Sequence, residues 1–275
     1  MKNLRTTKMT WICLGLLISF NFSCKNGQTD NEKENSDQLL PRQIIDLSPT
    51  ISEDLPQKVW GKKMLKDFGF KESTKFTDVA IEDPLYVVDS YIELFNHGGA
   101  HLDAPNHLDK NAKSIDQYRL EQLVGKFKIF NASDKTKDES ISIDEIKQMV
   151  LDSGDIFILY VKYSPPQTEN DIPSYPYLSE EAAEYLSNIP IKAFATDGFS
   201  VDSMVKLYEN FGAGKKGYET LAPNHHSFLP KGIPVYEQLE NVNKLLGLKN
   251  AIFVGLPLKI KGSNASPVRA VVFVY

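Results

Sequence analysis

The chain alternates short apolar runs with polar segments that carry turn and capping residues. Residues 156–161 read IFILYV and residues 251–256 read AIFVGL, and both runs are apolar throughout. Runs of this length are typical of strands that are buried on both faces. We predict further strands at residues 43–48, 87–95, 126–130, 193–196 and 268–275. The pattern therefore indicates a largely buried sheet.

Two helices are predicted between these strands. The first opens with the capping box formed by Ser142 and Glu145, has Ile146, Met149 and Val150 on one face, and ends before Gly154. Ser179 caps the second, at residues 180–186. Strands and helices alternate at uneven spacing without an internal repeat. This order predicts a single α/β domain with a mixed sheet flanked by helices.

Residues 1–23 have the features of a lipoprotein-type signal peptide. Lys2, Arg5 and Lys8 precede the apolar run 11–22, which is shorter than a usual membrane span. Ser23 and Cys24 end this run and resemble a bacterial lipoprotein signal, in which Cys24 would be lipidated. An uncleaved anchor and a plain secretory signal are the alternatives. The expected location is extracytoplasmic, with a lipid anchor in a bacterial membrane.

The polar segment 24–41 is predicted to be a flexible tether, which leaves residues 42–275 as the folded domain. Net charge is −5 and no run of Lys or Arg forms a basic stripe, so nucleic-acid binding is not expected. Cys13 and Cys24 are the only cysteines. The folded domain therefore has no disulfide, zinc knuckle or cysteine nucleophile.

All five histidines lie in two clusters. Residues 97–107 read HGGAHLDAPNH, and His225-His226 is followed by Glu237. Neutral imidazole is the commonest metal ligand in proteins. The glycines at 98 and 99 and the proline at 105 favour a loop over a helix, and they let two imidazoles converge. The two clusters predict one metal site assembled from distant segments.

His97, His101 and Asp103 form a ligand set that suits zinc, manganese or iron(II). His225 and Glu237 either complete this site or form a second one. Two metals about 3.5–4 Å apart would polarise a carbonyl and generate hydroxide at neutral pH. His107 is then left over, beside the metals, and is placed to act as a general acid/base.

At this point the chain resembles the cyclase family, whose best-known members are the bacterial kynurenine formamidases. The family signature is His-x-Gly-Thr-His-x-Asp-x-Pro-x-His, and residues 97–107 depart from it only at Ala100, where the family has Thr. Other segments match the family in order, at residues 46–48, 196–202, 225–237, 256–259 and 266–270. The resemblance therefore covers about residues 43 to 275.

The resemblance implies an α/β domain with a barrel-like central sheet, usually a homo-oligomer (a dimer or tetramer). It implies two divalent metal ions, zinc or alternatively manganese. One metal would be held by His97, His101 and Asp103, the second by His225, and Asp103 and Glu237 would bridge them. His107 would be the proton donor and acceptor. Trp60 lies where the family often has a Trp that lines the substrate pocket, although a packed surface aromatic is an equal alternative.

These residues lead to a functional hypothesis: a metal-dependent hydrolase of a small-molecule amide or cyclic amide. Metal-bound hydroxide would attack the carbonyl and His107 would relay the proton. An aryl formamide such as N-formylkynurenine would give kynurenine and formate, a step of tryptophan catabolism. An isatin hydrolase-like opening of a cyclic amide is the alternative. A non-enzymatic metal- or ligand-binding lipoprotein is the rival class, and it would not need His107.

Overall fold

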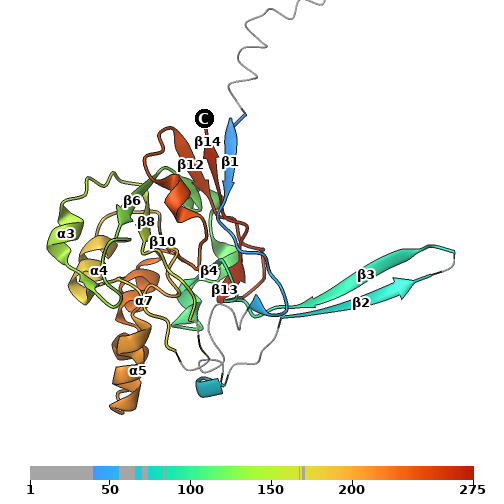
Figure 1. Ribbon diagram of the computed structural model, residues 1–275, viewed down its shortest axis with the longest axis horizontal. Coiled ribbons are helices and arrows are strands. Elements are labelled where there is room, and N and C mark those ends of the chain that lie inside the picture. The colour runs from blue at the N-terminus through green and yellow to red at the C-terminus, as the bar shows by residue number, and fades with distance from the viewer. Residues whose placement is uncertain (1–39, 56–65, 70–73, 83, 167, 169–170) are drawn as a thin grey trace, which may run out of the picture. The chain divides into compact units, whose positions relative to one another are not determined.

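The computed structural model describes residues 40–55, 66–69, 74–82, 84–166, 168 and 171–275 (Figure 1). Cys24, Trp60 and the predicted signal peptide and tether up to residue 39 lie outside the described residues. Among the helices that are described, none is long and apolar enough to cross a bilayer.

A six-stranded mixed sheet forms the centre of the fold, as the apolar runs predict. Its strand order is β13 (Ala265–Pro267), β4 (His101–Asp103), β11 (Val235–Glu237), β10 (Ala193–Thr196), β8 (Ile156–Tyr160) and β6 (Phe127–Asn131). The strands from β6 to β11 are parallel, whereas β4 pairs antiparallel with both β11 and β13.

A second sheet of four antiparallel strands packs against one face of the first. Its order is β1 (Gln43–Asp46), β14 (Val271–Val274), β12 (Ala251–Val254) and β5 (Val124–Gly125). Ile156 and Ile158 of β8 share a hydrophobic cluster with Phe253 and Val272 of this sheet. The predicted strands at 43–48, 251–256 and 268–275 are therefore confirmed as one sheet of the core.

Helices cover the other face of the six-stranded sheet (Figure 1). They are α3 (Ile143–Lys147), α4 (Glu180–Ser187) and α7 (Pro223–Phe228). Helix α5 (Met204–Gly212) begins at this layer with the buried Met204 and extends away from it, and α6 (Tyr218–Leu221) lies between α5 and α7 in the chain. Five 3₁₀ turns complete the described helical elements: η1 (Pro105–His107), η2 (Ile115–Gln117), η3 (Leu120–Gln122), η4 (Leu229–Lys231) and η5 (Val242–Leu245). Phe157 of β8 and Phe194 of β10 point to this side and cluster with Leu186 and Phe228.

These layers explain why the central strands are apolar at every position. Successive side chains of a strand point to opposite faces, so β8 contributes Phe157 to the helical layer and Ile158 to the sheet layer. Within the described residues, the strands pair as a six-stranded and a four-stranded sheet that share a hydrophobic core, and the barrel-like form that the resemblance implies is not confirmed.

Two local predictions need correction. The helix that opens at Ser142 has the predicted capping box, but it ends at Lys147, and Val150 is 77% exposed. Residues 101–103 were expected in a loop but form strand β4. This three-residue strand is too short to give a sequence signal and exists because β11 and β13 pair with it on both sides.

Two smaller pairs of strands lie outside the main sheets. β7 (Ser140–Ile141) pairs in parallel with β9 (Tyr177–Leu178), while β2 (Lys75–Ile81) and β3 (Val87–Glu93) form an antiparallel ribbon. The ribbon stands clear of both sheets in Figure 1. β3 confirms the predicted strand at 87–95, but all seven of its residues are exposed.

Candidate metal centre

Strands β4 and β11 bring a histidine and two carboxylates together at one point. His101 and Asp103 are two residues apart on β4 and therefore point to the same face. Glu237 lies directly opposite His101 in the antiparallel register of β4 and β11. Opposite residues of such a pair have Cβ atoms about 4.5–5.5 Å apart. Sheet pairing therefore places Glu237 beside residues that precede it by more than a hundred positions.

A tight turn before β4 adds His97. Gly99 has φ of +71°, and a Cβ there would lie 2.9 Å from the side chain of Leu55, so this position requires glycine. The turn sets Nδ1 of His97 2.9 Å from Oδ1 of Asp103. The Gly99 carbonyl accepts a hydrogen bond of 2.8 Å from Nδ1 of His101. Because that nitrogen carries the proton, Nε2 of His101 is left as a lone-pair atom facing the carboxylates.

His225 reaches the same point from helix α7. Its Nδ1 donates to Oδ2 of Asp202 at 2.6 Å, and Asp202 also accepts from the backbone N–H groups of Asn224 and His225. A carboxylate behind a histidine fixes the ring and its tautomer, as is common behind metal-ligating histidines. Nε2 of His225 therefore presents a lone pair, 3.3 Å from both Asp103 and Glu237.

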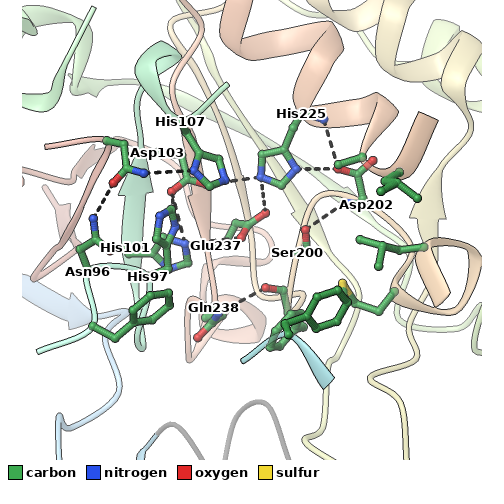
Figure 2. Close-up of a pocket in the computed structure, with 18 residues that line it drawn as sticks. Asn96, His97, His101, Asp103, His107, Ser200, Asp202, His225, Glu237 and Gln238 are labelled. Atoms are coloured by element: carbon green, nitrogen blue, oxygen red, sulfur yellow. Dashed lines mark hydrogen bonds and ion pairs between the residues drawn. The ribbon is translucent and has the colours of Figure 1, made fainter. Parts of the chain in front are cut away.

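The two carboxylates divide their oxygens between the histidines. Oδ1 of Asp103 lies 2.9 Å from His97 and 3.5 Å from His101, while its Oδ2 lies 3.3 Å from His225. Glu237 repeats this arrangement, with Oε2 at 3.5 Å from His101 and Oε1 at 3.3 Å from His225. Each carboxylate thus offers one oxygen to each side, as a ligand that bridges two cations would (Figure 2).

The donor atoms of this cluster fit a divalent metal. Among the described residues, Nε2 of His101 is buried without a hydrogen-bond partner, and carboxylate oxygens of Asp103 and Glu237 lie 3.5 Å from it. Such atoms carry a large desolvation cost unless a cation or proton lies between them. The ligand atoms of His101, Asp103 and Glu237 lie within 4.8 Å of one another, and so do those of His97, Asp103 and His107. The mixed imidazole and carboxylate set suits zinc or manganese better than calcium.

The electrostatics favour positive charge here. Burial would raise the pKa of Asp103, but the charges of His97 and His101 and the hydrogen bonds from His225 and His97 outweigh it and hold this pKa well below its usual range. Burial would lower the pKa of His101, but the Asp103 and Glu237 carboxylates outweigh it and raise that pKa. The field that holds a proton on His101 would equally hold a metal cation.

His107 lies beside this cluster on the 3₁₀ turn η1. Its ring centroid is 4.5 Å from that of His97 and 5.7 Å from that of His225. Asn96 donates to Asn264 at 2.6 Å, and the Asn264 amide contacts Nδ1 of His107 at 3.4 Å. Burial lowers the pKa of His107 to about 4, against the opposing charge of Asp103. His107 is therefore neutral near pH 7.

A cavity of about 420 Å³ opens over these groups. The predicted ligands and His107 form its polar part, as Figure 2 shows. Its apolar lining comprises Phe68, Phe95, Phe199, Met204, Leu207, Leu221 and Ala222, while Asn96, Ser200, Asp202 and Asn264 add further polar groups. Gln238 also lines it, and its buried Oε1 has no hydrogen-bond partner in the part of the chain that the structure describes. The cavity could therefore hold a largely apolar ligand and offers an acceptor beside the metal ligands.

The structure brings together six residues that the sequence analysis singled out: His97, His101, Asp103, His107, His225 and Glu237. Trp60 lies outside the described residues, and His226, which had no assigned role, is exposed. Asp202, Asn264 and Gln238 were not predicted as site residues. Asp202 could have been predicted, because it lies in the segment 196–202 that resembles the cyclase family. Asn264 and Gln238 could not, because only tertiary contacts bring their side chains to the site.

Sequence comparisons find relatives of this chain among the kynurenine formamidases. Kynurenine formamidase from Bacillus thuringiensis subsp. konkukian (strain 97-27) is 28% identical over 177 residues, which is 64% of this chain and 75% of that protein. The kynurenine formamidase of Geobacillus thermodenitrificans (strain NG80-2) is 25% identical over 231 residues, which is 82% of this chain and 95% of that protein.

Solved structures show the same fold. An isatin hydrolase bound to the product analogue thioisatinate aligns with a TM-score of 0.68 at 20% identity, covering 90% of this chain and 98% of that one. A potential metal-dependent hydrolase with cyclase activity aligns with a TM-score of 0.59 at 22% identity, over 85% and 98% of the two chains. Residues 45–203 match the Cyclase family model, described as "Putative cyclase". Since this match covers more than half of the 275 residues, the chain belongs to the Cyclase family.

Proposed function

We propose that this protein is a metal-dependent hydrolase that cleaves an amide bond, either in an aryl formamide such as N-formylkynurenine or in a cyclic amide such as isatin. The relatives named kynurenine formamidase and the structurally similar isatin hydrolase support these two substrate classes. One observation carries the proposal: Asp103 and Glu237 each direct one oxygen toward the His101 side and the other toward His225.

That division of oxygens supports the following set of ligands. His97 and His101 would hold one divalent ion and His225 the other, while Asp103 and Glu237 would bridge them, with zinc favoured and manganese the alternative. The ions would polarise the substrate carbonyl and make a water molecule acidic at neutral pH. Asp202 would keep His225 in the ligating tautomer through its 2.6 Å bond.

His107 would move the proton. Its ring centroid lies 4.5 Å from that of His97 and 5.7 Å from that of His225, so it could accept a proton from a water molecule attacking beside the ligands. It would then pass this proton to the leaving nitrogen, which must be protonated before the C–N bond breaks. Asn96 and Asn264 hold the ring through the 3.4 Å contact at Nδ1.

The cavity supports a substrate with an aromatic ring. Phe95 and Phe199 are part of its wall, and both candidate substrates join a benzene ring to the scissile amide. Apolar walls with a few polar groups at one end are the usual design of a small-molecule site. A protein that only bound metal would need the ligands, but it would need neither His107 nor this apolar wall.

The remaining proposals concern the whole chain and its surroundings. Residues 1–23 would be a lipoprotein signal peptide, Cys24 the lipidated residue, residues 24–41 a tether and residues 42–275 the catalytic domain. The protein would then be extracytoplasmic and would contact the membrane through its lipid anchor only. Trp60 would line the substrate pocket, and the protein would form a homo-oligomer.

Replacing His107 by Ala tests the central step of the proposal. Turnover of N-formylkynurenine or isatin should fall by about 10²–10⁴-fold, the range expected for loss of a general acid/base. Metal content per chain, measured by elemental analysis, should stay unchanged. The matched control is His226→Ala, which removes an exposed histidine and should leave both values as in the wild type.

Two results would contradict the assignment. If metal content fell together with turnover in His107→Ala, His107 would be a ligand, a role that its closeness to His97 and Asp103 makes geometrically feasible. If wild-type protein with bound metal hydrolysed neither substrate, both substrate classes would be wrong while the ligand assignment stood.

A further inference from the structure

A second cavity, of about 710 Å³, opens at the same edge of the central sheet as the metal centre. Residues within 49–55, 160–165 and 238–243, together with Asp197, supply its walls, so it lies beyond the carboxyl ends of the parallel strands β8, β10 and β11. Ligands commonly bind at such an edge. Of the described residues that line it, only Gln238 also lines the cavity over the metal centre. The second cavity is therefore a separate candidate binding site.

Asp197 puts a buried negative charge in the wall of the second cavity. It is 8% exposed, and its two carboxylate oxygens accept the backbone N–H groups of Val161 at 2.7 Å and Tyr163 at 3.1 Å. These donors satisfy hydrogen bonds but carry no formal charge, and no Lys, Arg or His side chain of the described chain forms an ion pair with Asp197. Burial accordingly raises its pKa to about 6. Because buried charges in proteins are normally paired, this carboxylate favours a cationic ligand.

Gln238 adds an acceptor close to Asp197. Its backbone N–H donates to the carbonyl of Gly198 at 3.0 Å, which places Gln238 beside the residue that follows Asp197. Gln238 is 6% exposed and its Nε2 donates to the Phe199 carbonyl at 3.3 Å, whereas its buried Oε1 has no hydrogen-bond partner among the described residues. A buried amide oxygen without a donor is costly, so a ligand with N–H groups would stabilise this wall of the second cavity.

The backbone around the second cavity is held in uncommon conformations. Six non-glycine residues of the described chain have φ in the left-handed region, and three of them line this cavity: Lys162 at +53°, Gln238 at +59° and Asn241 at +58°. They belong to two separate segments, one after β8 and one after β11. Left-handed φ is uncommon for residues other than glycine, and such positions concentrate at ligand sites. Their concentration here indicates a built site rather than a packing gap.

The composition of the walls indicates the chemistry of the ligand. The buried apolar side chains among them are Leu55, Tyr160, Leu239 and Val242. Asp54 and Glu240 join Asp197 as acidic groups, whereas Lys162 is the one basic side chain among the described lining residues. The volume is that of a typical small-molecule site. These walls suit an organic cation with an apolar body better than a bare metal ion, which would require several oxygen ligands around one point.

We propose that the second cavity binds a primary amine with an aromatic body, and that the ammonium group of this ligand pairs with Asp197 and donates to Oε1 of Gln238. The aromatic body would lie against Tyr160 and Leu239, which line the same cavity. Tyrosine rings attract cations through their faces, which adds to the preference for an amine. The site lies outside the cavity over the metal centre, so this proposal goes beyond the proposed hydrolysis and does not depend on it.

Isothermal titration calorimetry of the purified protein with two probes tests the class of ligand. 2-Phenylethylamine carries both the ammonium group and the ring, whereas 2-phenylethanol has nearly the same shape and no charge. The wild type should bind the amine about 10–100-fold more tightly than the alcohol, because hydrogen bonds to charged groups are stronger than those between neutral groups.

Two variants locate the binding. Asp197→Asn removes the charge, so the preference for the amine over the alcohol should disappear, whereas a merely disordered wall would weaken the binding of both probes. Thr50→Trp places a large ring at an exposed lining position and should abolish the binding of both. Asp155→Asn is the matched control, since Asp155 is also a buried carboxylate that accepts a backbone N–H, from Asp152 at 2.9 Å, but it does not line the second cavity. It should keep the wild-type affinities.

Circular dichroism checks that each variant is folded, and Thr50→Trp alone decides the location if Asp197→Asn is not. A wild type that does not bind the amine at millimolar concentration, or that binds amine and alcohol equally, would show that the second cavity is not an amine site. A preference for the amine that survives in Asp197→Asn, or amine binding that survives in Thr50→Trp, would show that the amine binds elsewhere. Each of these results would overturn the proposal, and none of them bears on the turnover of amides at the metal centre.

Discussion

For single residues of the site, the partner of each histidine Nδ1 decides which nitrogen can face a metal. The Gly99 carbonyl accepts a hydrogen bond from Nδ1 of His101, and the Asp202 carboxylate accepts one from Nδ1 of His225. Both rings therefore direct Nε2 toward Asp103 and Glu237. The histidine spacing in the sequence predicts the ligands, whereas these tautomers follow only from the folded contacts.

Replacing Asp202 by Asn tests the role of this second partner. The amide can donate to Nδ1 of His225, which would shift the ring proton to Nε2 and block the ligating lone pair. Metal affinity should fall by about 10–100-fold, as is usual for such outer partners. Competition with a chromogenic chelator measures this loss.

Asp155→Asn is the control, because Asp155 is also buried but binds the backbone of Asp152 and does not line the cavity. It should leave metal affinity at the wild-type value. Equal affinities in wild type and Asp202→Asn would show that His225 does not depend on this carboxylate.

The lowered pKa of His107 predicts a pH dependence of stability. The unfolded chain takes up a proton at this histidine near pH 6.5, whereas the native state does so only near pH 4. Stability is therefore unaffected above about pH 6.5 and declines as the pH falls toward 4. Between pH 7 and pH 5, protonation of this histidine alone should lower the free energy of unfolding by about 2 kcal/mol.

The measurement is urea unfolding of chelator-treated protein at both pH values. His107→Gln has a side chain that stays neutral, so its loss of stability between pH 7 and pH 5 should be smaller than that of the wild type by about 2 kcal/mol. If wild type and His107→Gln lost the same free energy of unfolding between pH 7 and pH 5, His107 would not be buried as a neutral ring.

Among the elements, β4 connects the site to the core. Its outer residues His101 and Asp103 face the cluster, while Leu102 between them is fully buried in the opposite hydrophobic layer. Leu102→Ala should lower the free energy of unfolding by about 2–5 kcal/mol and weaken metal binding, because the strand that carries two ligands loses its anchor.

Leu246→Ala is the control, because Leu246 is 41% exposed. This substitution should change the free energy of unfolding by no more than about 0.5 kcal/mol. Chemical denaturation and metal titration give both quantities. A Leu102→Ala protein with unchanged stability and affinity would show that β4 does not depend on core packing.

The elements also show what a sequence can predict. β8 and β10 were predicted because their apolar runs are buried between two layers. The capping box at Ser142 and the cap at Ser179 fix two helix starts, because the signal is local. β4 was missed because three residues between distant partners carry no periodicity, and Asn264 was missed because nothing near it in the chain indicates its contact with His107.

In the whole molecule, the site depends on segments that are far apart in the chain. Residues 97–107, Asp202, His225 and Glu237 meet because the parallel strands β10 and β11 direct their carboxyl ends to one edge of the sheet, next to β4. Ligands commonly bind at such an edge in open α/β sheets. A metal cluster at this point would connect both halves of the chain.

The most direct test is elemental analysis of the purified protein, together with hydrolysis assays on N-formylkynurenine and isatin. The account predicts about two zinc or manganese ions per chain, turnover of at least one of the two substrates, and loss of turnover when a chelator removes the metal. Metal content no higher than in a His101→Ala, Glu237→Ala double variant would contradict it.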